Sequence, residues 1–315
     1  MKNRILTSVF ILLITGIFIA SRYYTPYAFD VFVGILAVMG CVEVTKVLER
    51  KRCFTNILFV GSFPAIMYIA MIIGIHYERS VLVYMLYFIV ILIALFLLNF
   101  LYSYLFTNVT QREKDKYGVF DTDARYSFKK SMNSAFVMIY PALLFVCLFV
   151  INHFFEFSFV DKLTLSDPDI VVLFFIVFIF AVTMMTDTFA LLVGMTLKGP
   201  KLCPTISPKK TISGAIGGFV FGTLSGILVY YLFSLNIVFG EAITLFDFAI
   251  WKFAIMAGIT SIVGQCGDLV ASALKRSARV KDYGTIFPGH GGVMDRVDGL
   301  IFNALCVLVA MFILI

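Results

Sequence analysis

Residues 272–298 read SALKRSARVKDYGTIFPGHGGVMDRVD, and this stretch decides how the rest of the chain is interpreted. It combines charged residues with glycines and one histidine, yet it lies between two strongly apolar runs, 248–265 and 297–315. Polar and charged groups are costly to place beside the hydrocarbon of a membrane. Chemistry at a membrane surface is the simplest reason for a chain to keep them there.

The composition indicates a polytopic membrane protein. Hydrophobic residues make up 61% of the 315 residues and charged residues only 14%, whereas soluble domains carry about 25% charged residues. A helix crosses the hydrocarbon core with about 20 apolar residues, and the runs here are long and continuous rather than alternating. We therefore predict an all-α protein with about nine transmembrane helices, at residues 5–20, 31–48, 56–75, 81–106, 135–157, 170–197, 214–235, 248–265 and 297–315.

The distribution of basic residues predicts the side of the membrane on which each loop lies. With nine spans, the amino terminus and the loops after spans 2, 4, 6 and 8 share one side and hold 21 of the 25 Lys and Arg residues. The other four are Arg22, Arg79, Lys162 and Lys252. Because cytoplasmic loops carry the excess of Lys and Arg, we predict that the amino terminus and these loops are cytoplasmic.

We divide the chain at residue 134. Residues 1–134 would hold the N-terminal transmembrane helices and a cytoplasmic loop, and residues 135–315 the C-terminal catalytic region. The 107–134 loop mixes both charge signs, which fits either a surface helix on anionic headgroups or a solvated connector. Within the 214–235 run, glycines at 214, 218, 222 and 226 line one helix face, suited to close contact within the chain or between two copies.

Three polar clusters fall near the cytoplasmic ends of the last four predicted helices. The first surrounds Asp187, which lies about 26 Å along a helix that starts near residue 170. An ionisable group at that depth is a functional candidate. The alternative is a structural carboxylate that neighbouring hydroxyls or a lysine satisfy.

The second cluster is the stretch 207–214, which reads SPKKTISG and opens a glycine-rich helix. Either Thr211 or Ser213 could cap that helix. Free amides at a helix start, together with Lys209 and Lys210, favour a phosphate. An ordinary basic cytoplasmic loop explains this cluster equally well when it is considered alone.

The third cluster is the stretch quoted at the outset. On a helix, Asp268, Ser272, Lys275 and Arg279 form one polar stripe, because they follow at i, i+4, i+7 and i+11. The glycine-rich 288–292 segment must be a turn.

Two further carboxylates, Asp295 and Asp298, stand one helical turn apart at the start of the last helix. Carboxylates from separate segments beside several cations suggest Mg²⁺ that holds a polyphosphate. Salt bridges are the alternative, but they explain neither the glycines nor His290.

At these residues the sequence resembles the phosphatidate cytidylyltransferase family, also called CDP-diacylglycerol synthases. Residues 272–298 match the signature S-x-[apolar]-K-R-x4-K-D-x-[small]-x2-[apolar]-P-x-H-G-G-[apolar]-x-D-R-[apolar]-D at every specified position. The stretches DTFA at 187–190 and SPKKT at 207–211 also look like family elements, in the expected order. Five positions or pairs depart from the family pattern, namely Leu191, Met195, Lys198-Gly199, Ser213 and Ala271.

The resemblance implies an integral membrane enzyme of phospholipid biosynthesis that converts CTP and phosphatidate to CDP-diacylglycerol and pyrophosphate. It implies Mg²⁺ on Asp268 and Asp295, with K⁺ as a second cation. It also implies a homodimer among membrane lipids, in the plasma (inner) membrane, with no nucleic-acid partner.

On the same basis we expect two sets of site residues. The expected catalytic set is Asp268, Asp295, Lys275, Arg276, Lys281, His290, Arg296 and Asp298. The expected substrate-binding set is Asp187, Ser207, Lys209, Lys210, Ser272, Gly291 and Gly292.

Other functions stay open at this point. One is a CTP-dependent enzyme that acts on another lipid phosphate or on a lipid alcohol. Another is a transporter, although a transporter more often shows midplane charges and an internal repeat, whereas the polar clusters here gather at one face. A third is a family member that keeps only a structural role.

Overall fold

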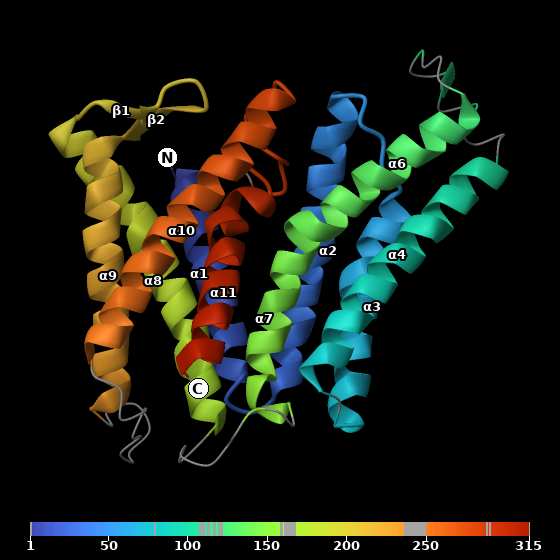
Figure 1. The fold of residues 1–315 in the computed structure, drawn as a ribbon. Helices are drawn as coiled ribbons and strands as arrows, with labels where there is room; N and C mark the ends of the chain where they lie inside the picture. Colours follow the sequence, from blue (N-terminus) through green and yellow to red (C-terminus); the bar gives the residue numbers. More distant parts are fainter. Residues whose placement is uncertain are drawn as a thin grey trace.

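The computed structural model describes residues 2–78, 80–106, 111, 114–115, 118, 122–157, 160, 168–235, 250–287, 289 and 291–314, without the side chains of residues 2–8 and 81. In these ranges the protein is a bundle of long helices with one small hairpin (Figure 1). Eight of the described helices are long and apolar enough to cross a membrane. The prediction of an all-α polytopic membrane protein is therefore confirmed.

The first four helices follow the first four predicted spans. They are α1 (Lys2–Ser21), α2 (Pro26–Arg50), α3 (Ile57–His76) and α4 (Val81–Leu105). Proline at the first position of α2 suits a helix start because that N–H has no intrahelical partner. The apolar part of α1 with described side chains, Val9–Ser21, is shorter than a full span. Whether the chain has nine spans, as predicted, or eight therefore depends on this helix.

The next span is bent, and the one after it is a single continuous helix. α6 (Asp123–Val137), η1 (Met138–Leu143) and α7 (Leu144–Asn152) follow one another, and the short helix η2 (Phe154–Glu156) comes next. The bend lies at η1, where Tyr140 leaves helical geometry before Pro141, because proline cannot donate to the helical ladder. α8 (Pro168–Leu197) then crosses the bundle as a single 30-residue helix.

The rest of the chain carries the predicted polar clusters. An antiparallel hairpin of β1 (Lys201–Cys203) and β2 (Ser207–Thr211) leads into α9 (Ile212–Ser234). It is followed by α10 (Ile250–Ser277) and α11 (Met294–Leu314). The hairpin was not predicted, because strands of three and five residues are too short to show a repeating pattern.

α10 is longer than its predicted span, which ended at residue 265. It continues to Ser277, so Asp268, Ser272 and Lys275 do lie on one helix, as predicted. The prediction was wrong for Arg279, which lies past the end of the helix with a backbone φ of 57°. The helical stripe is therefore shorter by one residue than the spacing suggested.

The glycine face of α9 packs inside the chain. A Cβ on Gly218 would lie 2.9 Å from the Thr186 carbonyl oxygen of α8, and one on Gly222 would lie 2.8 Å from Ser261 Oγ of α10. These positions therefore serve contact among α8, α9 and α10 rather than leaving a glycine face open for a second copy.

The N-terminal and C-terminal helices form one continuous bundle. Figure 1 shows α7 between α2 and α11, and α7 packs against both. The boundary at residue 134 stays a prediction, and it lies within α6.

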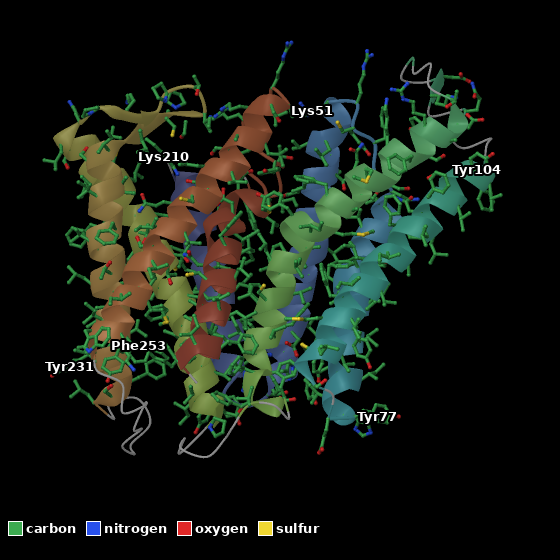
Figure 2. All side chains as sticks on the ribbon, viewed as in Figure 1. Lys51, Tyr77, Tyr104, Lys210, Tyr231 and Phe253 are labelled. Carbon is green, nitrogen blue, oxygen red and sulfur yellow. The ribbon has the colours of Figure 1, made fainter. Side chains whose placement is uncertain are left out.

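The labelled residues show which parts of the chain share an end of the bundle. Lys51, Tyr104 and Lys210 lie at the end that carries the hairpin, whereas Tyr77 and Tyr231 lie at the opposite end (Figure 2). The junction between α10 and α11 also lies toward the hairpin end (Figure 1). Most of the predicted site residues therefore gather at one end of the helices.

A buried polar network occupies the other end. His153 Nε2 lies 2.8 Å from Asp30 Oδ2, and His153 Nδ1 lies 2.8 Å from Glu156 Oε1. Asp30 also accepts hydrogen bonds from the Tyr68 hydroxyl (2.8 Å) and Asn152 Nδ2 (2.7 Å). The His153 side chain is fully buried in this network.

Candidate functional site

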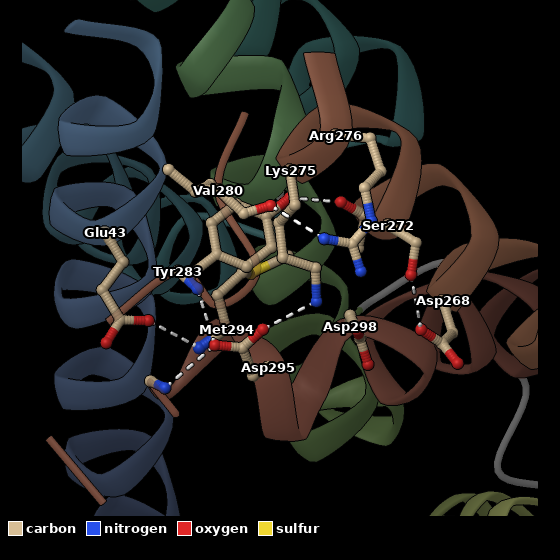
Figure 3. A network of polar contacts seen from close by, with 12 residues as sticks. Glu43, Asp268, Ser272, Lys275, Arg276, Val280, Tyr283, Met294, Asp295 and Asp298 are labelled. Carbon is tan, nitrogen blue, oxygen red and sulfur yellow. Dashed lines mark hydrogen bonds and ion pairs between the residues drawn. The ribbon is translucent and has the colours of Figure 1, made fainter. Parts of the chain in front are cut away.

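The loop between α10 and α11 folds around Asp295 (Figure 3). Lys275 Nζ donates to Asp295 Oδ1 at 2.7 Å. The backbone N–H groups of Tyr283 and Gly292 both donate to Asp295 Oδ2, at 2.7 and 2.9 Å. Three of the predicted site residues, Asp295, Lys275 and Gly292, are thus in direct contact.

The glycines of this loop let it close tightly over the carboxylate. Gly291 has a φ of 83°, in the left-handed region that favours glycine. The Phe287 N–H donates to the Gly291 carbonyl at 2.9 Å, and a Cβ on Gly291 would lie 2.7 Å from Asp295 Oδ2. His290 lies outside the described residues, so its expected role stays a prediction.

A second carboxylate, Asp268, faces the hairpin. Lys210 Nζ of β2 lies 2.6 Å from Asp268 Oδ2, and the Ser272 hydroxyl donates to Asp268 Oδ1 at 3.3 Å. The Lys210 and Asp268 side chains are 28% and 29% exposed, so each is within reach of a ligand from solution. The hairpin therefore brings the second predicted cluster against the third.

Neighbouring residues of β2 point to opposite faces, which separates the two lysines. Lys210 reaches Asp268, whereas Lys209 is exposed and Ser207 is half-buried at the strand's start. Thr211 caps α9, because its Oγ1 accepts the Gly214 N–H at 3.1 Å. Of the two caps considered from the sequence, Thr211 is the one that forms.

Asp298 is another buried carboxylate of the site, with 8% of its surface exposed. Its Oδ1 accepts the N–H of Gly299 at 2.9 Å, and Asp268, Lys275 and Asp187 all lie near enough to interact with it electrostatically. Carboxylates from α8, α10 and α11 therefore converge at this end of the bundle.

Asp187 and Arg296 connect these carboxylates to an apolar groove. The groove has a volume of about 400 Å³ and lies between α1, α2, α8 and α11. Its walls are mainly apolar side chains, among them Phe10, Leu36 and Leu300, and its charged lining residues are Asp187 and Arg296. The site thus combines a cluster of charges with a surface suited to a hydrocarbon chain.

Besides Lys209, two of the predicted basic residues are not brought to the carboxylates. Arg276 is exposed, and its guanidinium donates to the carbonyls of Ile206 (3.2 Å) and Val280 (3.1 Å). It therefore ties the hairpin tip to the end of α10. Lys281 is exposed in the loop that follows.

Sequence reasoning missed two residues that shape the site. Glu43 of α2 accepts the backbone N–H groups of Val293 and Met294, at 3.0 and 2.8 Å. A lone acid inside the apolar run 31–48 is the same kind of signal that singled out Asp187, and it could have been used.

Tyr283 is the other missed residue. Its hydroxyl donates to the Ala271 carbonyl at 3.1 Å, and its ring lies 5.1 Å from Lys275 Nζ. Burial raises the pKa of the Tyr283 phenol, and the nearby Tyr140 raises that pKa further. Tyr283 therefore stays neutral and acts as a wall beside Lys275.

The carboxylates fit a cation that arrives with its own oxygen ligands. Within the described residues, no three Asp, Glu, His or Cys side chains form a group that would hold a metal ion unaided. Mg²⁺ is usually held by one or two carboxylates plus substrate phosphates and water. Asp268, partly exposed and paired with a displaceable lysine, meets that requirement.

Comparison with known proteins finds relatives whose names all state the same activity. The chain is 45% identical over 129 residues to a phosphatidate cytidylyltransferase of Brucella suis biovar 1. The aligned residues cover 41% of this chain and 43% of the relative. It is 40% identical over 130 residues to one of Staphylococcus haemolyticus (41% and 46%). It is 40% identical over 129 residues to one of Rickettsia conorii (40% and 53%). The matches therefore span about half the length of these relatives.

The match to a family is more extensive than the match to any of these relatives. The pattern of the cytidylyltransferase family aligns with residues 2–314, which includes α1 to α4 as well as the carboxylate-bearing helices. The chain therefore belongs to the cytidylyltransferase family.

Proposed function

We propose that this protein is a phosphatidate cytidylyltransferase, which makes CDP-diacylglycerol and pyrophosphate from CTP and phosphatidate in phospholipid biosynthesis. The observation that carries the proposal is the meeting of Asp187, Asp268 and Asp298 with Lys210 and Lys275 at the charged end of an apolar groove. A soluble triphosphate and a lipid phosphate need such a combination. The names of the relatives support the same reaction.

The reaction needs positioning more than acid–base chemistry. An oxygen of the lipid phosphate attacks the α-phosphorus of CTP and forms a new P–O bond. The bond from the α-phosphorus to the bridging β-phosphate oxygen breaks, and its electron pair leaves with pyrophosphate. Because the nucleophile is already an anion, the protein's main tasks are alignment and neutralisation of charge.

The lysines are placed to exchange partners when substrate binds. Lys210 and Lys275 now pair with Asp268 and Asp295. We assign their ammonium groups to phosphate oxygens in the complex, with Arg296 on the lipid phosphate at the groove. Ser207, Ser272 and Lys209 would complete the phosphate contacts from the hairpin and α10.

We assign Mg²⁺ to Asp268 and Asp295, where it would neutralise phosphate charge and polarise the α-phosphate. Asp268 is the more accessible of the two. Asp295 already accepts three hydrogen bonds, so ligation by Oδ1 requires Lys275 to turn away. K⁺ as a second cation rests on the family resemblance alone.

The groove gives the lipid a place beside the charges. An acyl chain of phosphatidate would lie between α1, α2, α8 and α11, with its phosphate toward Asp187 and Arg296. The basic residues at the hairpin end support a cytoplasmic orientation of this face, so CTP would enter from the cytoplasm. A homodimer in the plasma (inner) membrane, without nucleic acid, completes the proposal.

The test uses purified protein, Mg²⁺ and mixed micelles with CTP labelled in the α- or γ-phosphate. With phosphatidate, we expect α-label to enter the organic phase and γ-label to leave as pyrophosphate. Label transfer only to a polyprenyl phosphate would change the substrate, and γ-label on diacylglycerol would identify a lipid kinase. No transfer from folded protein to any of these lipids would refute the proposal.

A further inference from the structure

We propose that Glu43, which lies in α2 far from the family signature, is a positioning residue for the catalytic loop. The expected effect on kinetics rests on the proposed function, whereas the contact between Glu43 and the start of α11 does not depend on it. Its carboxylate would hold the start of α11 and thereby keep Asp295 in place beside Lys275.

The contacts are short and divided evenly. Val293 N–H donates to Glu43 Oε1 at 3.0 Å and Met294 N–H to Oε2 at 2.8 Å. The preceding N–H, that of Gly292, goes to Asp295 Oδ2 at 2.9 Å. Three successive amides are thus shared between one carboxylate from α2 and one from α11 (Figure 3).

Two glycines show how closely the loop wraps this side chain. A Cβ placed on Gly284 or on Gly292 would collide with the Glu43 carboxylate. Both glycines belong to the stretch that the sequence singled out, and neither has a positive φ. Their lack of a side chain is therefore explained by the space that Glu43 occupies and not by backbone conformation.

Burial makes the contact energetically important. Glu43 is 3% exposed, and its carboxylate is stabilised there by amides at a helix amino terminus. Without it, two buried N–H groups would lose their partners, which is costly. The start of α11 would then shift, and Asp295 would shift with it.

A consequence for substrate binding follows. The amides of residues 292–294 would offer a phosphate site if they were free, but carboxylates already occupy all three. Phosphate binding is therefore left to the side chains, mainly Lys210 and Lys275.

The kinetic test compares Glu43→Gln with Asp30→Asn. Both residues are buried carboxylates of α2, at 3% and 4% exposure, and they lie about 20 Å apart along the helix. We expect Glu43→Gln to lower kcat about 100-fold, since misplacement by about 1 Å costs that much. We expect KM for CTP to change by less than threefold. Asp30→Asn should leave the kcat of the folded fraction unchanged.

A second measurement does not depend on activity. Hydrogen–deuterium exchange in detergent should show the amides of Val293 and Met294 protected in the wild type and in Asp30→Asn but less protected in Glu43→Gln, because glutamine keeps one acceptor oxygen for the two N–H groups. If wild type transfers no label but this pattern appears, the proposed function fails and the positioning contact stands. Unchanged protection together with unchanged kcat would overturn the inference.

A second variant tests the same contact from the loop side. Gly284→Ala presses on the Glu43 carboxylate from the loop, whereas Gly61→Ala in α3 has open space around its Cβ. We expect Gly284→Ala to lower kcat and loosen the same two amides, and Gly61→Ala to do neither. Equal behaviour of the two variants would also overturn the inference.

Discussion

At the scale of single residues, geometry separates basic side chains that sequence treats alike. Lys210 contacts Asp268, whereas Arg276 holds two backbone carbonyls and Lys281 is exposed. All three lie in family-like stretches. Which of them reaches the carboxylates depends on the face of β2 to which each side chain points and on where α10 ends.

We predict that Lys210→Met lowers kcat/KM for CTP about 10–100-fold, the range for loss of a charge-assisted phosphate contact. Lys114→Met is the matched control. Lys114 forms a similar pair, in which its Nζ lies 2.8 Å from Asp123 Oδ1, and this pair lies away from the site. Steady-state kinetics in mixed micelles measure both. Equal kinetics for the two variants would contradict the role of Lys210 at the phosphate.

At the scale of elements, the glycine face of α9 sets how closely α8 and α10 approach. A Cβ on Gly222 would collide with Thr186 Oγ1 and lie 2.8 Å from Ser261 Oγ, and these two hydroxyls already bond to each other at 2.9 Å. The helices that carry Asp187 and Asp268 thus meet through small residues. Their spacing depends on the absence of side chains at this face, Gly222 included.

We expect Gly222→Ala to destabilise the protein by about 1–3 kcal/mol, the usual cost of overpacking, and to lower kcat with it. Gly61→Ala, which meets no atom within 4 Å, should have neither effect. Thermal unfolding in detergent measures the change in stability of each variant. Activity is then measured at a temperature at which both variants are folded. A stable and fully active Gly222→Ala protein would show that the close approach is dispensable.

At the scale of the whole molecule, ion pairs of His153 with Asp30 and Glu156 hold helices together at the end opposite the site. Burial lowers the pKa of His153, but hydrogen bonds to Asp30 and Glu156 outweigh burial and raise the pKa to about 9. The folded state therefore favours the protonated ring. This network joins α2 to the end of α7, and Tyr68 extends it to α3.

The sign of the pH effect follows from the raised pKa. The stabilisation by His153 should be complete below the unfolded-state pKa of about 6.5 and should fade as pH rises through about 9. We predict that the Tm difference between wild type and His153→Gln shrinks between pH 6.5 and 9.5. A difference that is constant or grows over this interval would contradict a protonated ring.

Sequence patterns located most of the architecture because long apolar runs leave few alternatives. The runs gave the helices, and the three polar clusters do converge at one end. The hairpin escaped prediction because its strands are short. The polar stripe did predict that α10 continues past residue 265, but the helix ends at Ser277 and leaves Arg279 outside it. Glu43 escaped because its partners, Val293 and Met294, lie 250 and 251 residues away, and only the fold brings them together.

The most direct test of the carboxylate cluster compares Asp268→Asn with Asp123→Asn in the α-labelled CTP assay with phosphatidate. Both aspartates pair with a lysine, at 2.6 and 2.8 Å, but only Asp268 lies in the cluster. We predict a fall in kcat of about 100-fold or more for Asp268→Asn, not restored by excess Mg²⁺, and near wild-type turnover for Asp123→Asn. Wild-type turnover by folded Asp268→Asn would contradict the assignment of this cluster as the active site.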